Sequence, residues 1–347
     1  MPKDVQTFRI ANPDFLALSM VRLFAFVLII TVITACNETV TDESPLLNQP
    51  PYATVSDSIR QSPKAADLYY RRGVLLYQGL HKDLALADLR TAWTLEPKEE
   101  FGLSLATALR QRSEDSVIHF LKGATIKLPQ SIAIKIGLAK SYQKVGQLTE
   151  SLKLTEEIIA LHPAQLDALL LKAELLEAQD KSNEALQALE TAYNYAPSDI
   201  DLANNLAFAY AEARHPKALT LSDSLIRMDA SRKHAEPYYF KGLYYENTGN
   251  TDKAIQLFDE AVQHDYYFLD AHMEKGQVYY NKKSYAAALK SFQLAATITP
   301  TFADAYYWVA KCLEAQGNND DARLNYQRAY ELDKSMKEAK DAMERLK

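Results

Sequence analysis

The chain has 347 residues, of which 48% are hydrophobic and 24% charged, so its composition is that of a folded chain and excludes wholesale disorder. Its formal net charge is −6, whereas nucleic-acid binding needs a basic surface, so we expect no nucleic-acid partner. Its two cysteines, Cys36 and Cys312, exclude a disulfide framework.

The first predicted element is a short apolar segment. Residues 23–34 read LFAFVLIITVIT and lie between Arg22 and Ala35. Because a membrane-spanning helix needs roughly 20 apolar residues, this run is too short to span and is typical of a signal peptide over residues 1–35. Met20 begins a short basic start, Met-Val-Arg, and is an alternative initiator.

A possible lipid-attachment site follows the apolar segment. Residues 33–36, Ile-Thr-Ala-Cys, resemble the bacterial lipobox, and this resemblance implies that Cys36 becomes the acylated first residue of a lipoprotein. Asn37 in place of Asp favours the outer membrane over retention in the inner one. The alternatives are a buried core strand and an ordinary cleaved signal with an incidental cysteine.

Residues 36–52 are predicted to be the lipidated cysteine and a flexible tether. They are polar, rich in Thr and Pro, and lack helical periodicity. A leading helix is expected within residues 53–65.

A repeat of about 34 residues follows. Prolines occur at 63, 97, 129, 163 and 197, and this fixed period is typical of a helical solenoid. Within each period small, aromatic and leucine residues recur at fixed spacing, which places them on one helical face. The best example is Tyr238, Gly242, Tyr245, Ala254, Phe258 and Ala261.

This pattern resembles the tetratricopeptide repeat over roughly residues 66–334. The resemblance implies an all-α fold, a right-handed superhelical solenoid of about eight antiparallel helix pairs, with a C-terminal capping helix in residues 335–347. The second repeat, ending at Pro129, is short, and in the fifth repeat Ala218 arrives one residue early. Gly146, Gly249 and Gly317 are expected where first helices end.

Motifs of catalysis are missing from the sequence. It contains no HExxH, no GxSxG, no Walker-type loop and no GxGxxG, so we expect no enzyme, cofactor or metal site. The nearest approach to a metal cluster is His264, Asp265, Asp270 and His272, which straddle a turn between repeats and are interpreted as solvated. Cys312 is interpreted as a small packed residue of a first helix.

Candidate binding residues come from the resemblance, which implies that first helices line an inner face. That face would be acidic and aromatic, which suits proteins or peptides with basic or amphipathic segments. Acidic residues near a helix start also complement the helix dipole, which is the competing interpretation. The candidates are Tyr70, Tyr77, Phe208, Glu236, Tyr239, Glu246, Asp270, Tyr280, Asp304 and Tyr307.

Together these features predict a lipoprotein of the bacterial cell envelope, anchored by its acyl group in the outer membrane. Its repeats would act as a scaffold or adaptor for other proteins. The alternative is an envelope protein that holds glycan or peptidoglycan through the same aromatic residues.

Overall fold

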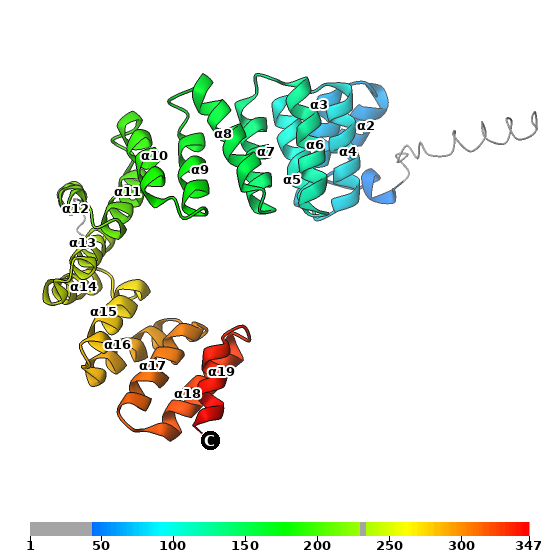
Figure 1. Cartoon of the computed structure of the whole chain (residues 1–347). Coiled ribbons are helices and arrows are strands. Elements are labelled where there is room, and N and C mark those ends of the chain that lie inside the picture. Colours follow the sequence, from blue (N-terminus) through cyan, green and yellow to red (C-terminus); the bar gives the residue numbers. More distant parts are fainter. Residues whose placement is uncertain (1–43, 230–233, 347) are drawn as a thin grey trace, which may run out of the picture. The chain divides into compact units, whose positions relative to one another are not determined.

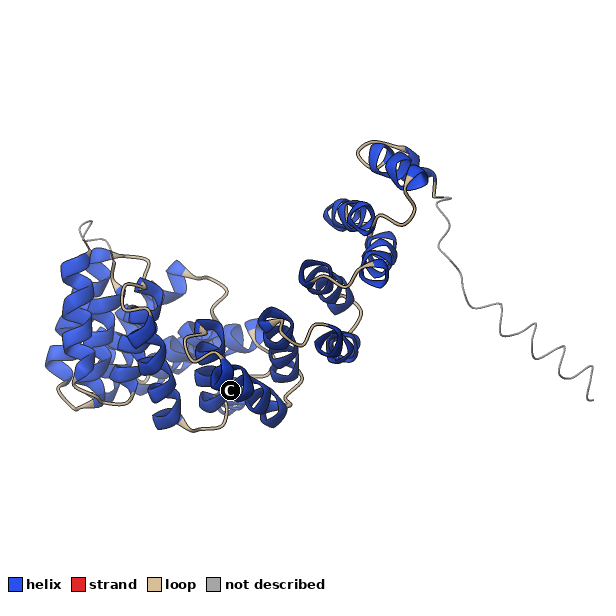
Figure 2. Cartoon of the chain, turned by 90° about the horizontal axis from the view of Figure 1, so that it is seen from above, coloured by secondary structure: helices blue, strands red, loops and turns tan. Residues whose placement is uncertain are grey.

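The computed structural model describes residues 44–229 and 234–346, and all of its regular elements there are helices (Figure 2). The predicted signal peptide, Cys36 and the first part of the predicted tether lie outside these residues. Among the described helices none is long and apolar enough to cross a membrane.

Within the described residues, helices α3 to α18 follow one another as eight pairs, which confirms the predicted all-α solenoid of about eight repeats. The pairs are α3 (Ala66–Gln78) with α4 (Lys82–Leu95), α5 (Glu99–Arg110) with α6 (Glu114–Lys127), α7 (Ile132–Lys144) with α8 (Leu148–Leu161), α9 (Leu166–Glu177) with α10 (Ser182–Tyr195), α11 (Ile200–Glu212) with α12 (Lys217–Met228), α13 (Glu236–Asn247) with α14 (Thr251–His264), α15 (Leu269–Asn281) with α16 (Tyr285–Ile298), and α17 (Ala303–Ala315) with α18 (Asn319–Leu332).

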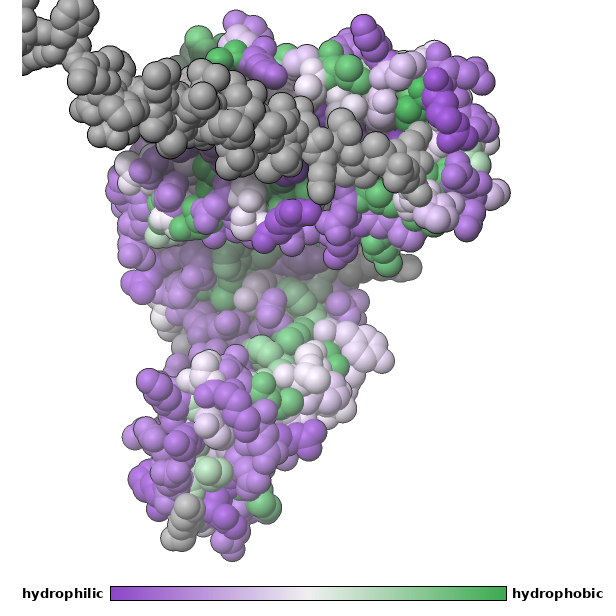
Figure 3. All heavy atoms as spheres, turned by 90° about the vertical axis from the view of Figure 1, so that its right-hand side faces the viewer, coloured by the Kyte–Doolittle hydropathy of each residue, from purple (hydrophilic) through white to green (hydrophobic). Residues whose placement is uncertain are grey.

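The chain forms two compact units that meet in sequence at Ile134 and Lys135, near the start of α7. In the second unit, helices α9 to α19 follow one another along a curved path (Figure 1). The last of them, α19 (Lys337–Arg345), buries Ala339 against α18 and so covers the end of the array. On the face shown in Figure 3, hydrophilic residues predominate and hydrophobic ones are scattered among them.

Small residues set the distance between the two helices of a pair. A Cβ atom on Gly242 would lie 2.5 Å from Cε1 of Phe258, and one on Gly276 would lie 2.5 Å from Cε1 of Phe292. Such distances are far shorter than any van der Waals contact, so only glycine allows this approach. In both repeats the small residue of the first helix lies against the aromatic residue of the second helix, which agrees with the register predicted from the sequence.

The turns inside the pairs use left-handed backbone. Gly146, Gly249 and Gly317 have φ angles of +77°, +87° and +82°, as expected for residues that end a first helix. In four other repeats the same turn position is held by a residue with a side chain at φ between +54° and +64°, namely Leu80, Asp180, Arg214 and Lys283.

The structure of the N-terminal end differs from the predicted tether. Residues Pro45–Asn48 form a short 3₁₀ helix, η1, and Ala53–Gln61 form α2. Leu47 and Tyr52 are buried against Leu76 and Ala85 of the first repeat. The prediction of a tether is therefore wrong for residues 44–52, because apolar residues within a Pro-rich segment cover the otherwise open end of the first repeat.

Candidate functional site

The ten predicted binding residues all lie on first helices, and the structure separates them into three groups. Tyr70 and Tyr77 lie on α3 in the first unit. Phe208, Glu236, Tyr239, Glu246 and Asp270 lie on α11, α13 and α15, whereas Tyr280, Asp304 and Tyr307 lie on α15 and α17.

The two tyrosines of α3 bind the next first helix of their own chain. The Tyr70 hydroxyl donates to Oε1 of Glu100 at 2.8 Å, and its ring stacks on Phe101 with centroids 4.7 Å apart. The Tyr77 hydroxyl accepts a hydrogen bond from Gln111 at 2.8 Å. Both hydroxyls therefore link α3 to α5, which makes these residues structural as well as partly accessible.

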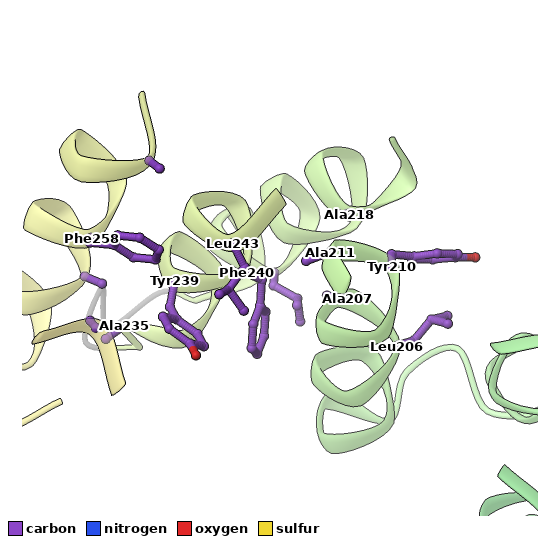
Figure 4. Close-up of a cluster of buried hydrophobic side chains, with 14 of the residues drawn as sticks. Leu206, Ala207, Tyr210, Ala211, Ala218, Ala235, Tyr239, Phe240, Leu243 and Phe258 are labelled. Atoms are coloured by element: carbon purple, nitrogen blue, oxygen red, sulfur yellow. The ribbon is translucent and has the colours of Figure 1, made fainter. Parts of the chain in front are cut away.

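Aromatic residues join α11 to α13 in the second unit. The Phe208 side chain is 42% exposed, and its ring meets Phe240 edge-on at 6.1 Å. Tyr239 contacts Phe240, Phe258 and Phe268 and is only 8% exposed. Figure 4 shows Tyr239 and Phe240 pointing to the same side of α13, with the Tyr239 hydroxyl at the outer end of its ring. The prediction of Tyr239 as an accessible groove residue is thus corrected, since its ring is part of the core.

Carboxylates surround this aromatic core. Burial, together with the charges of Glu274 and Glu212, raises the pKa of Glu246 to about 7. Burial and the charges of Glu212 and Asp270 raise the pKa of Glu274 as well. Burial, and after it the charges of Glu274, Asp270, Glu212 and Glu246, raises the pKa of Tyr239 as well.

Two buried carboxylate oxygens of α13 lack hydrogen-bond partners among the described residues. They are Oε2 of Glu236 at the start of the helix and Oε2 of Glu246 near its end. Glu212 receives a hydrogen bond from Nδ2 of Asn247 at 3.3 Å, and the same nitrogen donates to the Ala211 carbonyl at 3.2 Å. An unpartnered carboxylate oxygen is costly to bury, so these groups are suited to a donor from outside the chain.

A different arrangement occupies α15 and α17. The ammonium of Lys311 lies 5.3 Å from the ring centroid of Tyr280, 5.6 Å from that of Tyr307 and 4.6 Å from that of Trp308. These three rings form a cage that is already filled by a cation of the chain. A cavity of about 700 Å³ opens beside the cage and is also lined by Glu338 of α19.

Two of the charged residues that line that cavity, Glu314 and Arg345, are paired with each other. Glu314 accepts a hydrogen bond from Tyr326 at 2.8 Å and forms an ion pair with Arg345 of α19 at 2.6 Å. Its pKa is held below the ordinary value chiefly by the bond to Arg345. Asp304 is exposed in the first turn of α17, where a carboxylate complements the helix dipole.

Several residues of these sites were missed from the sequence. Glu274 lies two residues before the small residue Gly276, and Trp308 lies two residues before the small residue Ala310. Phe240 holds the same position before Gly242 in the repeat that precedes Glu274. In other repeats that position also holds Arg71 and Asn205, so a polar residue there gave no signal for Glu274. Glu212 and Arg345 carried no signal either, because their neighbours lie on other helices.

The possible metal cluster is not formed in the described part of the chain, where no group of three or more His, Cys, Asp or Glu residues could hold a metal ion. His272 is buried rather than solvated, and its Nε2 lies 2.9 Å from the Tyr266 carbonyl oxygen. Cys312 is a fully buried free thiol, and burial raises its pKa to about 12. Such a thiol is packed and poorly nucleophilic at neutral pH, as expected.

Comparison with known families gives four matched segments. A model described as tetratricopeptide repeat matches residues 136–200, 209–268, 241–302 and 294–337. These segments cover more than half of the chain.

One of the similar solved structures supports the fold. A tetratricopeptide repeat protein from Parabacteroides merdae is 17% identical, with a TM-score of 0.58, over 71% of this chain and 98% of that one. The Cut9–Hcn1 hetero-tetramer of the APC/C is 13% identical, with a TM-score of 0.48, over 85% of this chain and 59% of that one.

A human protein, Protein O-mannosyl-transferase TMTC1, is 23% identical over 201 residues, which are 57% of this chain. The chain spans only 23% of the length of that relative. The activity in the relative's name is therefore not carried over to this chain.

Proposed function

This chain belongs to the tetratricopeptide repeat family, and on that premise we propose that it is a non-catalytic scaffold or adaptor, anchored as a lipoprotein in the bacterial cell envelope. The observation that carries the binding role is the surface at α11, α13 and α15. There the Phe208 ring of α11 is 42% exposed, and on α13, which packs against α11, two buried carboxylate oxygens have no hydrogen-bond partner among the described residues. Both features favour contact with a segment of another protein.

The binding role can be tested with a photo-crosslinking amino acid at Phe208 and, as a control, at Leu324. The Leu324 side chain is 55% exposed on the second helix α18, so both positions are accessible. We expect cells that carry the Phe208 substitution to yield covalent adducts with other envelope proteins, and cells that carry the Leu324 substitution to yield few. Equal yields from the two positions would remove the support for this binding surface.

The anchor is proposed from the sequence alone. A short apolar segment ends in Ala35 and Cys36, and Asn37 favours the outer membrane. Replacement Cys36→Ser should abolish incorporation of labelled fatty acid and release the chain from the membrane fraction. A Cys36→Ser chain that stays in the membrane fraction with its label would contradict the lipoprotein assignment.

The alternative is an envelope protein that holds glycan or peptidoglycan, and it is favoured by Tyr280 and Tyr307, which line the cavity of about 700 Å³. Sugar rings stack on aromatic rings of this kind. Soluble peptidoglycan fragments should then bind the chain saturably and lose that binding in Tyr307→Ala. An adaptor for proteins should show no saturable binding.

A further inference from the structure

A groove of about 660 Å³ lies in the first unit, between the second helices α4 and α6. Both of these helices pack on α5, whose buried residues Leu105 and Leu109 form the floor of the groove. The binding surface proposed above lies on first helices of the second unit, so this groove is a separate feature of the chain.

Aromatic rings form the walls of the groove. The ring of Trp93 on α4 and the ring of Phe120 on α6 meet edge-on, with their centroids 5.2 Å apart. Ala124 of α6 also lines the groove and is buried. Pockets that take up an apolar group are typically lined by aromatic and aliphatic side chains of this kind.

Gly123 leaves part of the groove unfilled. A Cβ atom on this residue of α6 would meet no side chain and no neighbouring helix within 4 Å. Phe120 lies three residues before Gly123 and Lys127 four residues after it, so the three share one face of the helix. A bulky side chain of another molecule can therefore rest on the helix at Gly123, between these two neighbours.

Two cations that line the groove have no carboxylate partner. Arg90 of α4 and Lys127 of α6 form no ion pair with the described residues. The Lys127 ammonium lies 5.7 Å from the centroid of the Trp93 ring, so its charge stands over an aromatic wall. These two positive charges are therefore available to an anion from outside the chain.

Asp115, which lines the other end of the groove, does not compensate Lys127. It lies twelve residues earlier in α6, which is about 18 Å along the helix, and salt screens charges beyond about 10 Å. Asp115 stands in the first turn of α6, where a carboxylate complements the helix dipole.

The length of the groove favours a polypeptide as its occupant. The stretch of about 18 Å between Asp115 and Lys127 equals about three turns of helix, or five to six residues of extended chain. Grooves between helices with an apolar floor bind amphipathic segments of other chains. The free cations Arg90 and Lys127 require that such a segment carry carboxylates beside its apolar residue.

We propose that the groove between α4 and α6 binds a segment of a partner polypeptide in which a bulky apolar side chain is flanked by carboxylates. The apolar side chain occupies the space at Gly123, against Trp93 and Phe120, and the carboxylates meet Arg90 and Lys127. This site goes beyond the proposed function, because it gives the chain a second binding surface on different helices.

The probes are three pools of dodecapeptides tested for retention on the immobilised full chain. The first has a central Phe flanked by Glu, the second a central Phe flanked by Gln, and the third a central Ser flanked by Glu; the other positions are mixtures of Gly, Ser and Ala. The net charge of the chain is −6, so a preference for acidic peptides requires a local basic site. At low ionic strength we expect the first pool to be retained at least tenfold more than either of the others.

Two charge variants test the role of the cations. Arg90→Gln/Lys127→Gln removes them, and the control Lys140→Gln/Lys153→Gln removes two exposed lysines of α7 and α8. Both variants change the net charge by the same amount. The first should reduce the preference for the Phe-Glu pool over the Phe-Gln pool at least fivefold, and the control should leave it unchanged.

A third variant, Gly123→Leu, tests the apolar space. The leucine side chain should fill this space, so the retention of the Phe-Glu pool should fall at least fivefold while the melting temperature does not fall. If the melting temperature does fall, the charge variants decide, because they leave the core of the unit intact.

The proposal is overturned by equal retention of the Phe-Glu and Phe-Gln pools, or by equal loss of preference in the two charge variants. Laurate, an anionic chain without peptide bonds, is the competing occupant. Saturable binding of laurate that Gly123→Leu abolishes, without retention of the Phe-Glu pool, would assign the groove to a lipid and overturn the proposal. Crosslinking at Phe208 reports on the second unit, so its outcome and the outcome of these tests are independent.

Discussion

The Arg72 guanidinium of α3 holds the Asp88 carboxylate of α4 through two hydrogen bonds, from Nε at 2.7 Å and from a terminal nitrogen at 2.9 Å. Arg72 is only 4% exposed and Asp88 only 6%. Arg72 also donates to Oγ of Ser56 on α2 at 3.0 Å, so the pair connects the leading helix to both helices of the first repeat.

Removal of one member of this pair should be far more harmful than removal of both. Asp88→Ala removes the carboxylate that accepts two hydrogen bonds from the buried Arg72 guanidinium, and should lower the free energy of unfolding by about 3–5 kcal/mol. The double variant Arg72→Met/Asp88→Leu replaces the pair with apolar groups and should recover most of that loss. Urea unfolding followed by circular dichroism measures both, and additive losses in the double variant would contradict this account.

Glycine positions offer a second test, because two helical glycines of this chain have opposite surroundings. A Cβ on Gly276 would meet the Phe292 ring at 2.5 Å, whereas one on Gly123 of α6 has no atom within 4 Å. Gly276→Ala should therefore lower the free energy of unfolding by about 1–3 kcal/mol. Gly123→Ala should raise it by about 1 kcal/mol, since alanine favours the helix. Unfolding midpoints that move in the same direction would disprove the assigned register.

Leu80 permits a stabilising substitution. Its backbone has a φ of +64° and its side chain is 77% exposed, so it bears the cost of left-handed backbone without a compensating contact. Leu80→Gly should raise the free energy of unfolding by up to about 1 kcal/mol, because strain of about 1–2 kcal/mol is relieved at some cost in unfolded-state entropy. Gln78→Gly, two residues earlier inside α3, is the control and should lower it. Thermal melts measure the stability of both variants. A loss of stability in both would contradict the strain inferred at Leu80.

The sequence was sufficient for the repeat but not for the charges. Proline spacing and the slots at Gly242 and Gly276 predicted the helix pairs, because each slot reflects a contact inside one repeat. The pairing of Arg72 with Asp88 and the hydrogen bond from Asn247 to Glu212 depend on how neighbouring helices are turned, and the 34-residue period does not specify that rotation. Tyr239 was misplaced for the same reason, since the contacts with Phe258 and Phe268 that bury it come from neighbouring helices.

Glu246 should make stability depend on pH. The pKa of Glu246 is raised from 4.5 to about 7 in the folded chain, so the folded chain keeps a proton that the unfolded chain releases above pH 4.5. The contribution of Glu246 to stability therefore falls as the pH rises from about 4.5 to about 7. Glu246→Gln stays neutral, so its melting temperature should approach that of the original chain at pH 4.5 and exceed it at pH 8.

The expected gain at pH 8 is about 1–2 kcal/mol, because one pKa unit corresponds to about 1.4 kcal/mol and water partly screens this half-buried group. Glu157→Gln on the exposed side of α8 is the control and should give a difference that does not vary with pH. Parallel curves of melting temperature against pH for Glu246→Gln and the original chain would show that Glu246 is ionised at no cost in the folded state. The repulsion inferred among Glu212, Glu246 and Glu274 would then be absent.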